Sequence, residues 1–304
     1  MKTGFIGIVG RPNVGKSTLL NCLTGEKVAI ATDKPQTTRN RIRGILTEEG
    51  GAPGEGFQMV FIDTPGIHKP RNKLGGFMTE TALGTLNEVD AVVFVVDGGL
   101  SEGTGDRHIL NILAETGTPK IAAVNKIDLM PPDAFKAVFD EYSKLGIFAK
   151  VIGISAKDGT NVGQLKEALR GMLPEGDMFF PPDMFTDHPE RFIVSEIIRE
   201  KLLMYLDDEI PHGVAVEIES YEETPALTKI GAVIICEKKS HKGIIIGKQG
   251  RKLKGIGMSA RIEIENLLGA KVFLELWVKV KENWRNNDFT LNNLGYNTVH
   301  KPKP

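Results

Sequence analysis

The sequence of 304 residues has few cysteines, no long apolar run and almost no net charge. Cys22 and Cys236 lie far apart in the chain, which excludes a disulfide framework and a cysteine zinc site. The longest apolar runs, such as Ala91–Val96, are far too short to cross a bilayer. With 38 Lys and Arg against 39 Asp and Glu, the chain is not a uniformly basic nucleic-acid coat. Its first ten residues predict a β-strand and not a signal peptide, so we expect a cytoplasmic protein.

Charge is distributed unevenly between the two halves of the chain. Residues 228–285 carry thirteen Lys and Arg against five Glu and have a net charge of +8, although the whole chain has −1. The remainder is therefore acidic. An acidic body joined to a basic module predicts two domains with different partners.

The first half alternates short β-branched runs with segments of helical length. Strands are expected at Phe5–Val9, Met59–Ile62, Ala91–Val96, Ile121–Val124 and Val151–Ile154. Helices are expected at Ser17–Leu23, Asp106–Thr116 and Asn161–Leu173. This alternation predicts an α/β fold with a mostly parallel sheet. The polar stretch Glu48–Gly56 predicts the tip of a hairpin.

The second half has a different pattern and begins after an irregular stretch. Residues 171–185 contain three Pro and two Gly without periodicity, which indicates an interdomain linker, although their aromatic residues suggest packing. The apolar pattern that follows predicts the order α-β-β-α-α-β, with strict alternation from Val272 to Val280. We expect a first domain over residues 1–175, a linker over 176–190 and a smaller α+β domain over 191–304.

Gly10–Ser17 (GRPNVGKS) follows the first expected strand and opens a helix, which is the context of a phosphate-binding loop. Backbone N–H groups of such a loop bind phosphate oxygens, helped by the helix N-terminus. Lys16 would reach the β- and γ-phosphates, and the Ser17 hydroxyl would bind Mg²⁺. This motif alone predicts only a nucleoside triphosphate.

Two further segments would complete the phosphate and metal site. Asp63-Thr64-Pro65-Gly66 closes the next strand, where Asp63 would hold Mg²⁺ and the Gly66 N–H would bind the γ-phosphate. A threonine from Lys34–Arg39 (KPQTTR) would complete the Mg²⁺ shell, and we expect Thr38 in preference to Thr37. Catalysis is expected to depend on Lys16, Thr38 and Gly66.

The base is predicted by Asn125-Lys126-Ile127-Asp128 at the end of the fourth strand. The Asp128 carboxylate can accept hydrogen bonds from N1–H and N2–H₂ of guanine, whereas adenine presents no such pair. Lys126 would lie against the base and ribose. Ser155-Ala156-Lys157 ends the fifth strand and would present a backbone N–H to guanine O6. Because these motifs all end predicted strands, where open α/β sheets bind ligands, this half is predicted to bind a guanine nucleotide.

Many GTPases place a Gln directly after DxxG to orient the attacking water, but Ile67 occupies that position here. Unaided hydrolysis is therefore expected to be slow. Asn13 would help to hold a monovalent cation, K⁺, near the phosphates, and His68 is a weaker candidate for a general base. The expected nucleotide-binding residues are Gly10, Arg11, Pro12, Asn13, Val14, Gly15, Lys16, Ser17, Thr18, Asp63, Gly66, Asn125, Lys126, Asp128, Ser155, Ala156 and Lys157, with Ser17, Thr38 and Asp63 at the metal.

The basic module contains a GxxG sequence, Gly247–Gly250, between an Ile run and many cations. In a KH fold such a loop lies close to the nucleic-acid backbone, while four nucleotides occupy an adjacent apolar groove. The simpler interpretation of this segment is a solvated basic surface with a turn between two helices. Few aromatics are nearby, so bases are expected to be recognised by their edges and by apolar contacts more than by stacking, and Trp277 and Trp284 are expected to serve core or edge packing in preference to stacking. The expected RNA-binding residues are Lys242, Ile246, Gly247, Lys248, Gln249, Gly250, Arg251 and Lys252.

The chain resembles the Era family of bacterial ribosome-assembly GTPases over nearly its whole length. The resemblance is carried by GRPNVGKSTLLN, KPQTTRNRI, FIDTPGIHKP, NKIDL, TDHPERF, REKLL, GIIIGKQG and LWVKVKENW. It implies a Ras-like P-loop GTPase domain followed by a type II KH domain. It also implies binding to the 3′ end of 16S rRNA, action in 30S subunit maturation and peripheral association with the inner membrane. The Gly50–Gly56 insertion and the Lys301–Pro304 tail are atypical of the family, and we expect a monomer.

Other functions remain open from the sequence alone. They are a tRNA-modification or tandem-domain ribosomal GTPase, a P-loop kinase of a small molecule, and an RNA-binding scaffold with a structural nucleotide. No second GTPase domain and no C-terminal cysteine motif are present, and NKID argues against the kinase. We expect GTP with Mg²⁺ to order the loops of Thr38 and Gly66 and so to reposition the KH module through residues 171–185.

Overall fold

The computed structural model describes residues 1–51, 55–67, 69–98, 104–207 and 210–296. Contacts divide the chain into two units. Unit 1 comprises Met1–Ala31, Thr38–Pro70 and Met78–Asp187, and unit 2 comprises Thr32–Thr37, Arg71–Phe77 and His188–Pro304. Two short segments of the first half therefore belong, by their contacts, with the second.

Unit 1 is built on a six-stranded sheet with the order β2-β3-β1-β4-β5-β6. The strands are β1 (Lys2–Val9), β2 (Ile42–Glu48), β3 (Phe57–Asp63), β4 (Ala91–Asp97), β5 (Lys120–Asn125) and β6 (Lys150–Gly153). All pairs are parallel except β2–β3, which is antiparallel. The five expected strands are present, and β2 was not expected. Because Glu48 pairs with Phe57, the segment between them closes a hairpin, as predicted; residues 52–54 of it lie outside the described residues.

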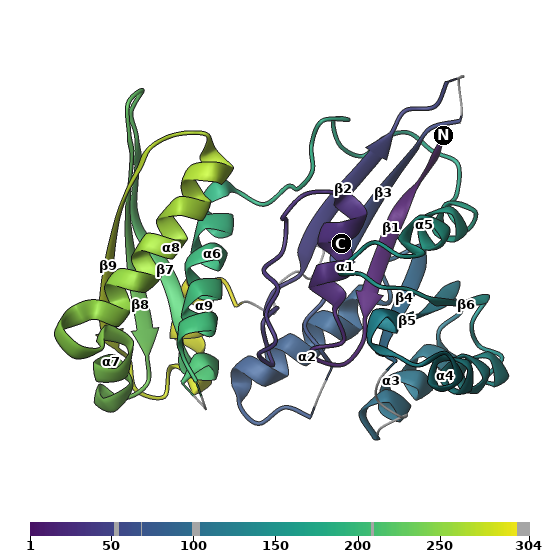
Figure 1. Ribbon diagram of the computed structural model, residues 1–304, viewed down its shortest axis with the longest axis horizontal. Helices are drawn as coiled ribbons and strands as arrows, with labels where there is room; N and C mark the ends of the chain where they lie inside the picture. The colour runs from purple at the N-terminus through teal and green to yellow at the C-terminus, as the bar shows by residue number, and fades with distance from the viewer. Residues whose placement is uncertain (52–54, 68, 99–103, 208–209, 297–304) are drawn as a thin grey trace. The chain divides into compact units, whose positions relative to one another are not determined.

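Helices cover both faces of this sheet (Figure 1). They are α1 (Lys16–Thr24), α2 (Lys73–Thr85), α3 (Thr104–Glu115), α4 (Pro132–Lys144) and α5 (Val162–Arg170). Ala82 of α2, Leu113 of α3 and Tyr142 of α4 share one buried cluster with Phe94 and Val124 of the sheet. Helices α1 and α5 contact each other and the remaining face. The carboxyl ends of the parallel strands meet at one edge, which positions the candidate site there.

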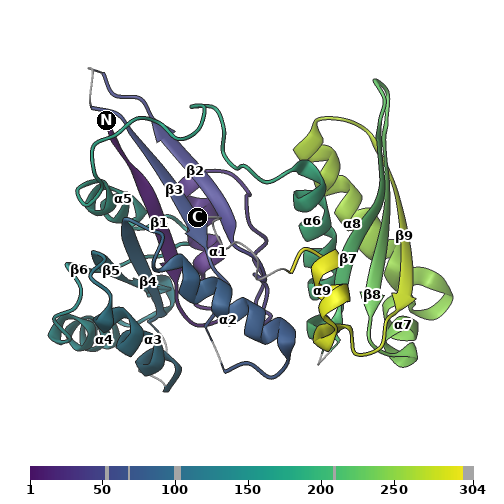
Figure 2. The same cartoon turned by 180° about the vertical axis from the view of Figure 1, so that it is seen from behind.

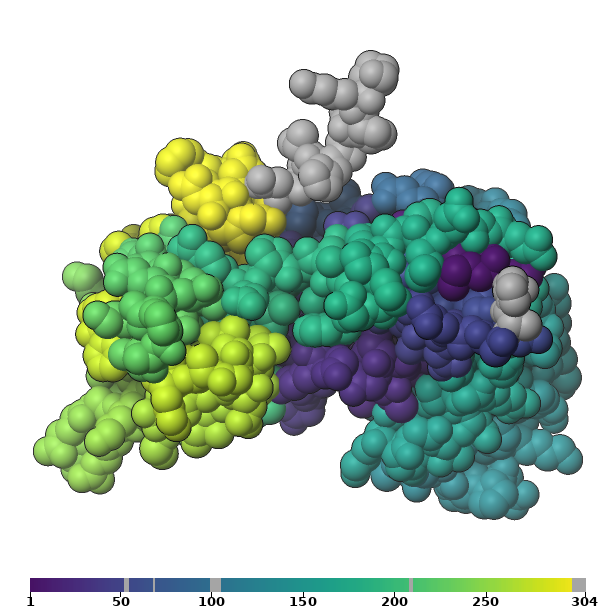
Figure 3. Space-filling view, turned by 90° about the horizontal axis from the view of Figure 1, so that it is seen from above, coloured from purple at the N-terminus to yellow at the C-terminus, as the bar shows by residue number. Residues whose placement is uncertain are grey.

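Residues 171–185, expected to be a linker, pack against unit 1. The Gln58 Oε1 atom on β3 accepts hydrogen bonds from the backbone N–H groups of Phe179 (2.7 Å) and Phe180 (3.0 Å). The Ile45 N–H donates to the Phe185 carbonyl at 2.8 Å, and the rings of Phe5 and Phe179 are 4.8 Å apart. In the space-filling view the teal atoms of this part of the chain lie at the surface beside purple and blue atoms of the N-terminal part (Figure 3). Its aromatic residues therefore pack as their sequence suggested, while the expected domain boundaries remain predictions.

Unit 2 contains a three-stranded sheet with the order β7-β8-β9 (Figure 2). Its helices and strands are α6 (Glu190–Tyr205), β7 (Ala215–Glu223), β8 (Thr228–Cys236), α7 (Lys239–Ile246), α8 (Arg251–Leu268), β9 (Val272–Val280) and α9 (Asp288–Asn293). Short 3₁₀ turns lie at Pro211–Gly213, Lys248–Gly250 and Trp284–Asn286 of unit 2, and another lies at Ile127–Leu129 of unit 1. Ile197 of α6 and Ile256 of α8 pack in one buried cluster with Ile234 of β8. The order of elements confirms the predicted α-β-β-α-α-β arrangement.

The two tryptophans of unit 2 have different surroundings. Trp284 is fully buried, and its indole N–H donates to the Gly213 carbonyl at 3.0 Å. Trp277, on the edge strand β9, keeps 48% of its surface exposed. Core packing therefore describes Trp284, whereas Trp277 is only partly packed.

A search of the described helices found none with the combination of length and apolar character that a membrane span requires.

Candidate nucleotide site and candidate nucleic-acid interface

The loop from Gly10 to Gly15 connects β1 to α1 and has the shape of a phosphate cradle. Gly15 has φ +96°, and a Cβ atom there would lie 2.3 Å from the Asn125 Nδ2 atom, so only glycine fits. Arg11 binds Asp106 of α3 at 2.9 Å, and Asp106 is buried. This ion pair, which the sequence did not reveal, fastens the loop to the neighbouring helix. Val14 is buried, and Pro12 and Asn13 lie at the loop surface.

Lys16 opens α1 and points its ammonium group back into the loop. Its Nζ atom donates to the carbonyl oxygens of Gly10 (3.2 Å) and Arg11 (2.8 Å). Burial lowers the pKa of Lys16 to about 8, against the opposing effect of the Asp63 carboxylate. The Lys16 ammonium group is thus held inside the loop, away from water, where phosphate oxygens would bind it.

The lowered pKa of Lys16 predicts that nucleotide binding weakens in mild alkali. Phosphates favour the ammonium form, which is mostly present at pH 7 and is the minor form at pH 8.5. We expect the affinity for GDP to fall about fourfold between these pH values. Isothermal titration calorimetry with the Lys16→Met protein is the control, because its weaker affinity should lack this pH dependence. The same slope in both proteins would contradict the assignment.

Ser17, Thr38 and Asp63 converge at the expected metal position. The Ser17 hydroxyl donates to Asp63 Oδ2 at 2.6 Å, Thr38 Oγ1 lies 3.1 Å from the same oxygen, and the two hydroxyl oxygens are 2.8 Å apart. All three residues are buried. Burial raises the pKa of Asp63 above its usual value, although Lys16, the two hydroxyls and the Thr64 N–H oppose this.

These residues fit a Mg²⁺ ion. Asp63 Oδ1 is buried and has no hydrogen-bond partner within the described structure, so the carboxylate retains an unused acceptor. Hydroxyl and carboxylate oxygens are the ligands that Mg²⁺ prefers, with phosphate oxygens and water completing the shell. Thr37, the less favoured candidate, turns its hydroxyl to the Lys34 carbonyl (2.6 Å) and the Thr32 hydroxyl (2.7 Å).

Gly66 and Ile67 follow β3 and lie against the phosphate loop. A Cβ atom at Gly66 would lie 2.6 Å from the Pro12 nitrogen, so a larger residue would push the two loops apart. The Ile67 N–H donates to the Gly10 carbonyl at 3.3 Å, and its side chain is buried in the cluster of Phe94 and Ala82. Ile67 therefore packs in the core and positions no water. His68 lies outside the described residues.

Asn125 joins the expected guanine site to the phosphate loop. Its Nδ2 atom donates to the Val14 carbonyl at 2.8 Å, and its Oδ1 atom accepts the Ala156 N–H at 2.9 Å. Ser155 is buried, and its N–H donates to the Thr160 carbonyl. Of the Ser-Ala-Lys backbone, the Lys157 N–H is thus the donor left for guanine O6 in this part of the described chain.

Lys126 and Asp128, which are expected to contact the base, directly follow β5. The Lys126 ammonium binds the Asn13 carbonyl (2.9 Å) and Asp97 Oδ2 (2.5 Å), so its stem runs beside the loop. Asp97 ends β4 at the same sheet edge as Asp63 and Asn125, and this position was the signal by which the sequence could have revealed it. Asp128, on the 3₁₀ turn Ile127–Leu129, is exposed and would be covered by a bound base.

The GxxG sequence of unit 2 forms a tight turn between two helices. Helix α7 ends at Ile246, and α8 begins at Arg251. Gly247 has φ +71°, and a Cβ atom there would lie 2.7 Å from the Lys252 Cβ atom. Lys242, Lys248, Gln249 and Arg251 are exposed, whereas Ile246, Gly247, Gly250 and Lys252 are half-buried. The expected RNA-binding residues are thus brought together on one loop and its two flanking helices.

Comparisons with known proteins agree with this division. The family described as "50S ribosome-binding GTPase" matches residues 5–126, and the KH domain family matches residues 209–285. The chain is 58% identical to GTPase Era of Alkaliphilus oremlandii, covering 97% of this chain and 99% of that protein, and 54% identical to GTPase Era of Clostridioides difficile, with the same coverage of both chains.

Two solved structures have the same fold over 97% of this chain and 99% of their own. One is a variant of Aquifex aeolicus Era bound to GDP·AlF₄⁻, with 40% identity and a TM-score of 0.92. The other is Era in complex with MgGDPNP and nucleotides 1506–1542 of 16S ribosomal RNA, with 39% identity and a TM-score of 0.91. Shared identity over the whole length, and not over one domain, establishes that the chain belongs to the GTPase Era family.

Proposed function

We propose that the protein is a GTP-hydrolysing switch that binds the 3′ end of 16S rRNA during maturation of the 30S subunit. The convergence of Ser17, Thr38 and Asp63 at the end of the phosphate loop carries the GTPase half of this proposal. The exposed basic turn around Lys248 carries the RNA half. The Era complex with MgGDPNP and 16S rRNA nucleotides supports both halves.

In the proposed reaction, the phosphate loop and Lys16 hold the triphosphate while Ser17, Thr38 and Asp63 hold Mg²⁺. The metal would neutralise charge that develops on the β- and γ-phosphate oxygens. The Gly66 N–H would bind the γ-phosphate. Ile67 stands where many GTPases have the Gln that orients the attacking water, and its side chain is buried, so turnover should be slow without a stimulating partner.

A potassium ion at Asn13 remains part of the proposal. Asn13 has φ +65°, which shapes the loop around the phosphates. Unchanged basal and partner-stimulated rates after sodium replaces potassium would exclude this ion. Cytoplasmic location, peripheral membrane association and the monomeric state also remain proposals.

We propose a route of coupling between GTP and RNA other than the one through residues 171–185. Residues 171–185 are bound to unit 1 and are poorly suited to transmit a movement. Within unit 2, the buried Arg199 of α6 donates a hydrogen bond to the carbonyl of Thr37 and pairs with Glu196. Thr37 precedes Thr38 at the metal position. We therefore favour Thr32–Thr37 as the connection, and equal RNA affinities with GDP and a non-hydrolysable GTP analogue would exclude any coupling.

The RNA half is tested by replacing Lys248 and Gln249 together with Asp. This variant puts two negative charges where RNA phosphates would lie, and we expect RNA affinity to fall about thirtyfold or more while GTP affinity is unchanged. The measurement is binding to nucleotides 1506–1542 of 16S rRNA at fixed salt.

A second double variant, Lys271→Asp with Asn266→Asp, provides the matched control. Both residues are exposed in unit 2, away from the GxxG turn in sequence, and the change in net charge is the same. RNA affinity should stay near that of the unaltered protein. Undiminished RNA binding by the Lys248→Asp/Gln249→Asp protein would exclude the GxxG turn as the RNA-binding site.

A further inference from the structure

The three-stranded sheet of unit 2 has one covered and one open face. Ile230, Ile234 and Val278 point into the core formed with α6 and α8. On the opposite face, β9 presents Phe273, 50% exposed, and Trp277, 48% exposed. Two aromatic side chains four residues apart on one strand lie on the same face, together with the exposed Glu275 and Lys279, so this face presents aromatic and charged groups to solvent in the described structure.

The Trp277 ring reaches across the neighbouring strand and is held there. Its pairing partner on β8 is Val233, but a Cβ atom built at Gly231 would lie 3.2 Å from Trp277 Cζ3 and 3.6 Å from Cη2. The six-membered ring therefore occupies the space that the missing side chain of Gly231 leaves. One part of the indole rests on the sheet, and the remainder stays open to a ligand.

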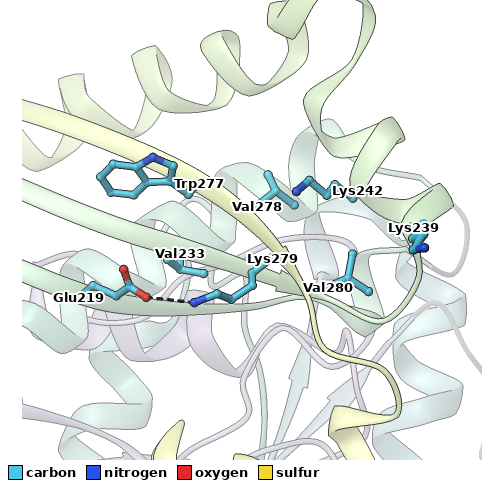
Figure 4. Close-up of a pocket in the computed structure, with 8 residues that line it drawn as sticks. All are labelled: Glu219, Val233, Lys239, Lys242, Trp277, Val278, Lys279 and Val280. Atoms are coloured by element: carbon cyan, nitrogen blue, oxygen red, sulfur yellow. Dashed lines mark ion pairs between the residues drawn. The ribbon is translucent and has the colours of Figure 1, made fainter.

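Trp277 borders a hollow of about 680 Å³ at the edge of the sheet (Figure 4). The residues that line it are Glu219, Val233, Lys239, Lys242, Trp277, Val278, Lys279 and Val280. The close-up shows the indole at one end and the two lysines of α7 at the other. An aromatic ring, valines and cations thus surround one space.

The charge of this hollow favours an anionic ligand. Lys239 and Lys242 are exposed on adjacent turns of α7, and within the described part of the chain no ion pair involves either of them. Lys279 is paired with Glu219 at 3.6 Å, with both side chains about half exposed. The lining therefore carries three positive charges against one negative charge. Cations beside a half-exposed aromatic ring are the combination that single-stranded nucleic acid recognises through phosphates and stacked bases.

The hollow also connects with the proposed RNA-binding turn. Lys242 lies four residues before Ile246, the last residue of α7, which is roughly 6 Å along the helix axis, and Gly247 of the turn follows directly. A single strand held at the turn can therefore continue along α7 toward Trp277. A protein strand added to the edge of β9 would need backbone hydrogen bonds but neither the cations nor the exposed indole.

We propose that this hollow is a second contact for single-stranded RNA, in which one base stacks on Trp277 and the adjacent phosphates bind Lys239 and Lys242. The proposal rests on the RNA binding proposed above and extends the contact from the GxxG turn to the edge of the sheet. It also revises the expectation that Trp277 serves packing in preference to base stacking.

The test uses the full-length protein and an RNA of nucleotides 1506–1542 of 16S rRNA. The chain has two tryptophans, and Trp284 is fully buried, so a change in fluorescence that depends on contact with a base reports on Trp277. We expect RNA to quench this emission, and we expect no quenching in the Trp277→Phe protein, which retains only Trp284. The Trp277→Ala protein should bind RNA about tenfold more weakly, the effect that loss of one stacked base produces.

Two comparisons separate stacking from a structural effect. Trp277→Phe keeps an aromatic face and should retain most of the RNA affinity. Phe289→Ala removes another aromatic of unit 2, 75% exposed on α9, and should leave RNA affinity unchanged. GTP affinity should be unaltered in all three proteins, and all three should be fully folded at the temperature of the binding measurement.

Unchanged RNA affinity of Trp277→Ala, together with unquenched emission, would overturn this contact. A loss of affinity that Trp277→Phe does not restore would also overturn it, because stacking requires only the ring. If Lys248→Asp/Gln249→Asp still abolishes binding in those cases, the RNA function stands and only the second contact fails. If that double variant binds normally, the proposed RNA function fails as well.

Discussion

Replacing Asp128 with Asn is expected to lower the affinity for GDP and GTP on the order of a thousandfold. In the proposed site, the exposed Asp128 carboxylate would accept hydrogen bonds from the two donors on the Watson–Crick edge of guanine. An Asn side chain offers one acceptor and presents its N–H₂ group to a second donor, so one hydrogen bond to a charged group is weakened and the other becomes a clash of donors. Hydrogen bonds to charged groups contribute about 1.5–3 kcal/mol each.

Calorimetry with GDP, ATP and xanthosine diphosphate measures the change in base preference. Xanthine carries an oxygen where guanine carries its amino group, so the Asn amide should bind xanthosine diphosphate better than GDP. Asp133→Asn, a change at an exposed carboxylate in the first turn of α4, is the matched control and should leave GDP affinity unaltered. If the Asp128→Asn protein keeps its preference for guanine, or if unaltered protein binds ATP as tightly as GTP, the base assignment fails.

The motifs of the expected nucleotide site coincide with strand ends, so the sequence alone places them at one edge of the sheet. Asp63 and Asn125 each terminate a run of buried β-branched residues, and parallel strands bring such ends to one edge. The approach of Thr38 to Ser17 and Asp63 does not follow from that geometry, because Thr38 lies in the irregular segment before β2. The ion pair of Lys126 with Asp97 does not follow from it either, since it depends on how two neighbouring strands align.

Elements without a clear apolar period were missed. Strand β2 contains Arg43, Gly44 and Thr47, and its place at the edge of the sheet requires fewer apolar residues than a central strand. A Cβ atom at Gly44 would lie 2.6 Å from Leu20 Cδ1, so this glycine serves the packing of α1 and is not a turn. Helix α2 includes Gly75-Gly76, a pair that usually marks a loop.

The alternation of apolar residues in β9 already predicts which face of the sheet Trp277 occupies. Val272, Val278 and their even-numbered neighbours face the core, so the same period directs Trp277 to the opposite side. Only the structure shows that Gly231 provides space for its ring. A glycine on a neighbouring strand cannot be matched to a tryptophan before the register of the two strands is known.

Replacing Thr38 with Ala is expected to lower the rate constant of GTP hydrolysis about a hundredfold and to leave GDP affinity nearly unchanged. The Thr38 hydroxyl lies against Ser17 and Asp63, where it would bind Mg²⁺ when the γ-phosphate is present. GDP lacks that phosphate, so the loss should appear in triphosphate binding and in kcat. Phosphate release under multiple-turnover conditions measures the first effect, and calorimetry with GDP and a non-hydrolysable GTP analogue measures the second.

The adjacent Thr37 makes this comparison decisive. Thr37→Ala removes the same group from the next residue, but that hydroxyl is already bonded to Lys34 and Thr32, so hydrolysis should change less than threefold. Thr38→Ser keeps the hydroxyl and should restore most of the rate. If Thr37→Ala abolished hydrolysis and Thr38→Ala did not, the metal ligand would be Thr37, and GTP would have to turn the Thr37 hydroxyl out of its bonds to Lys34 and Thr32 and toward Asp63.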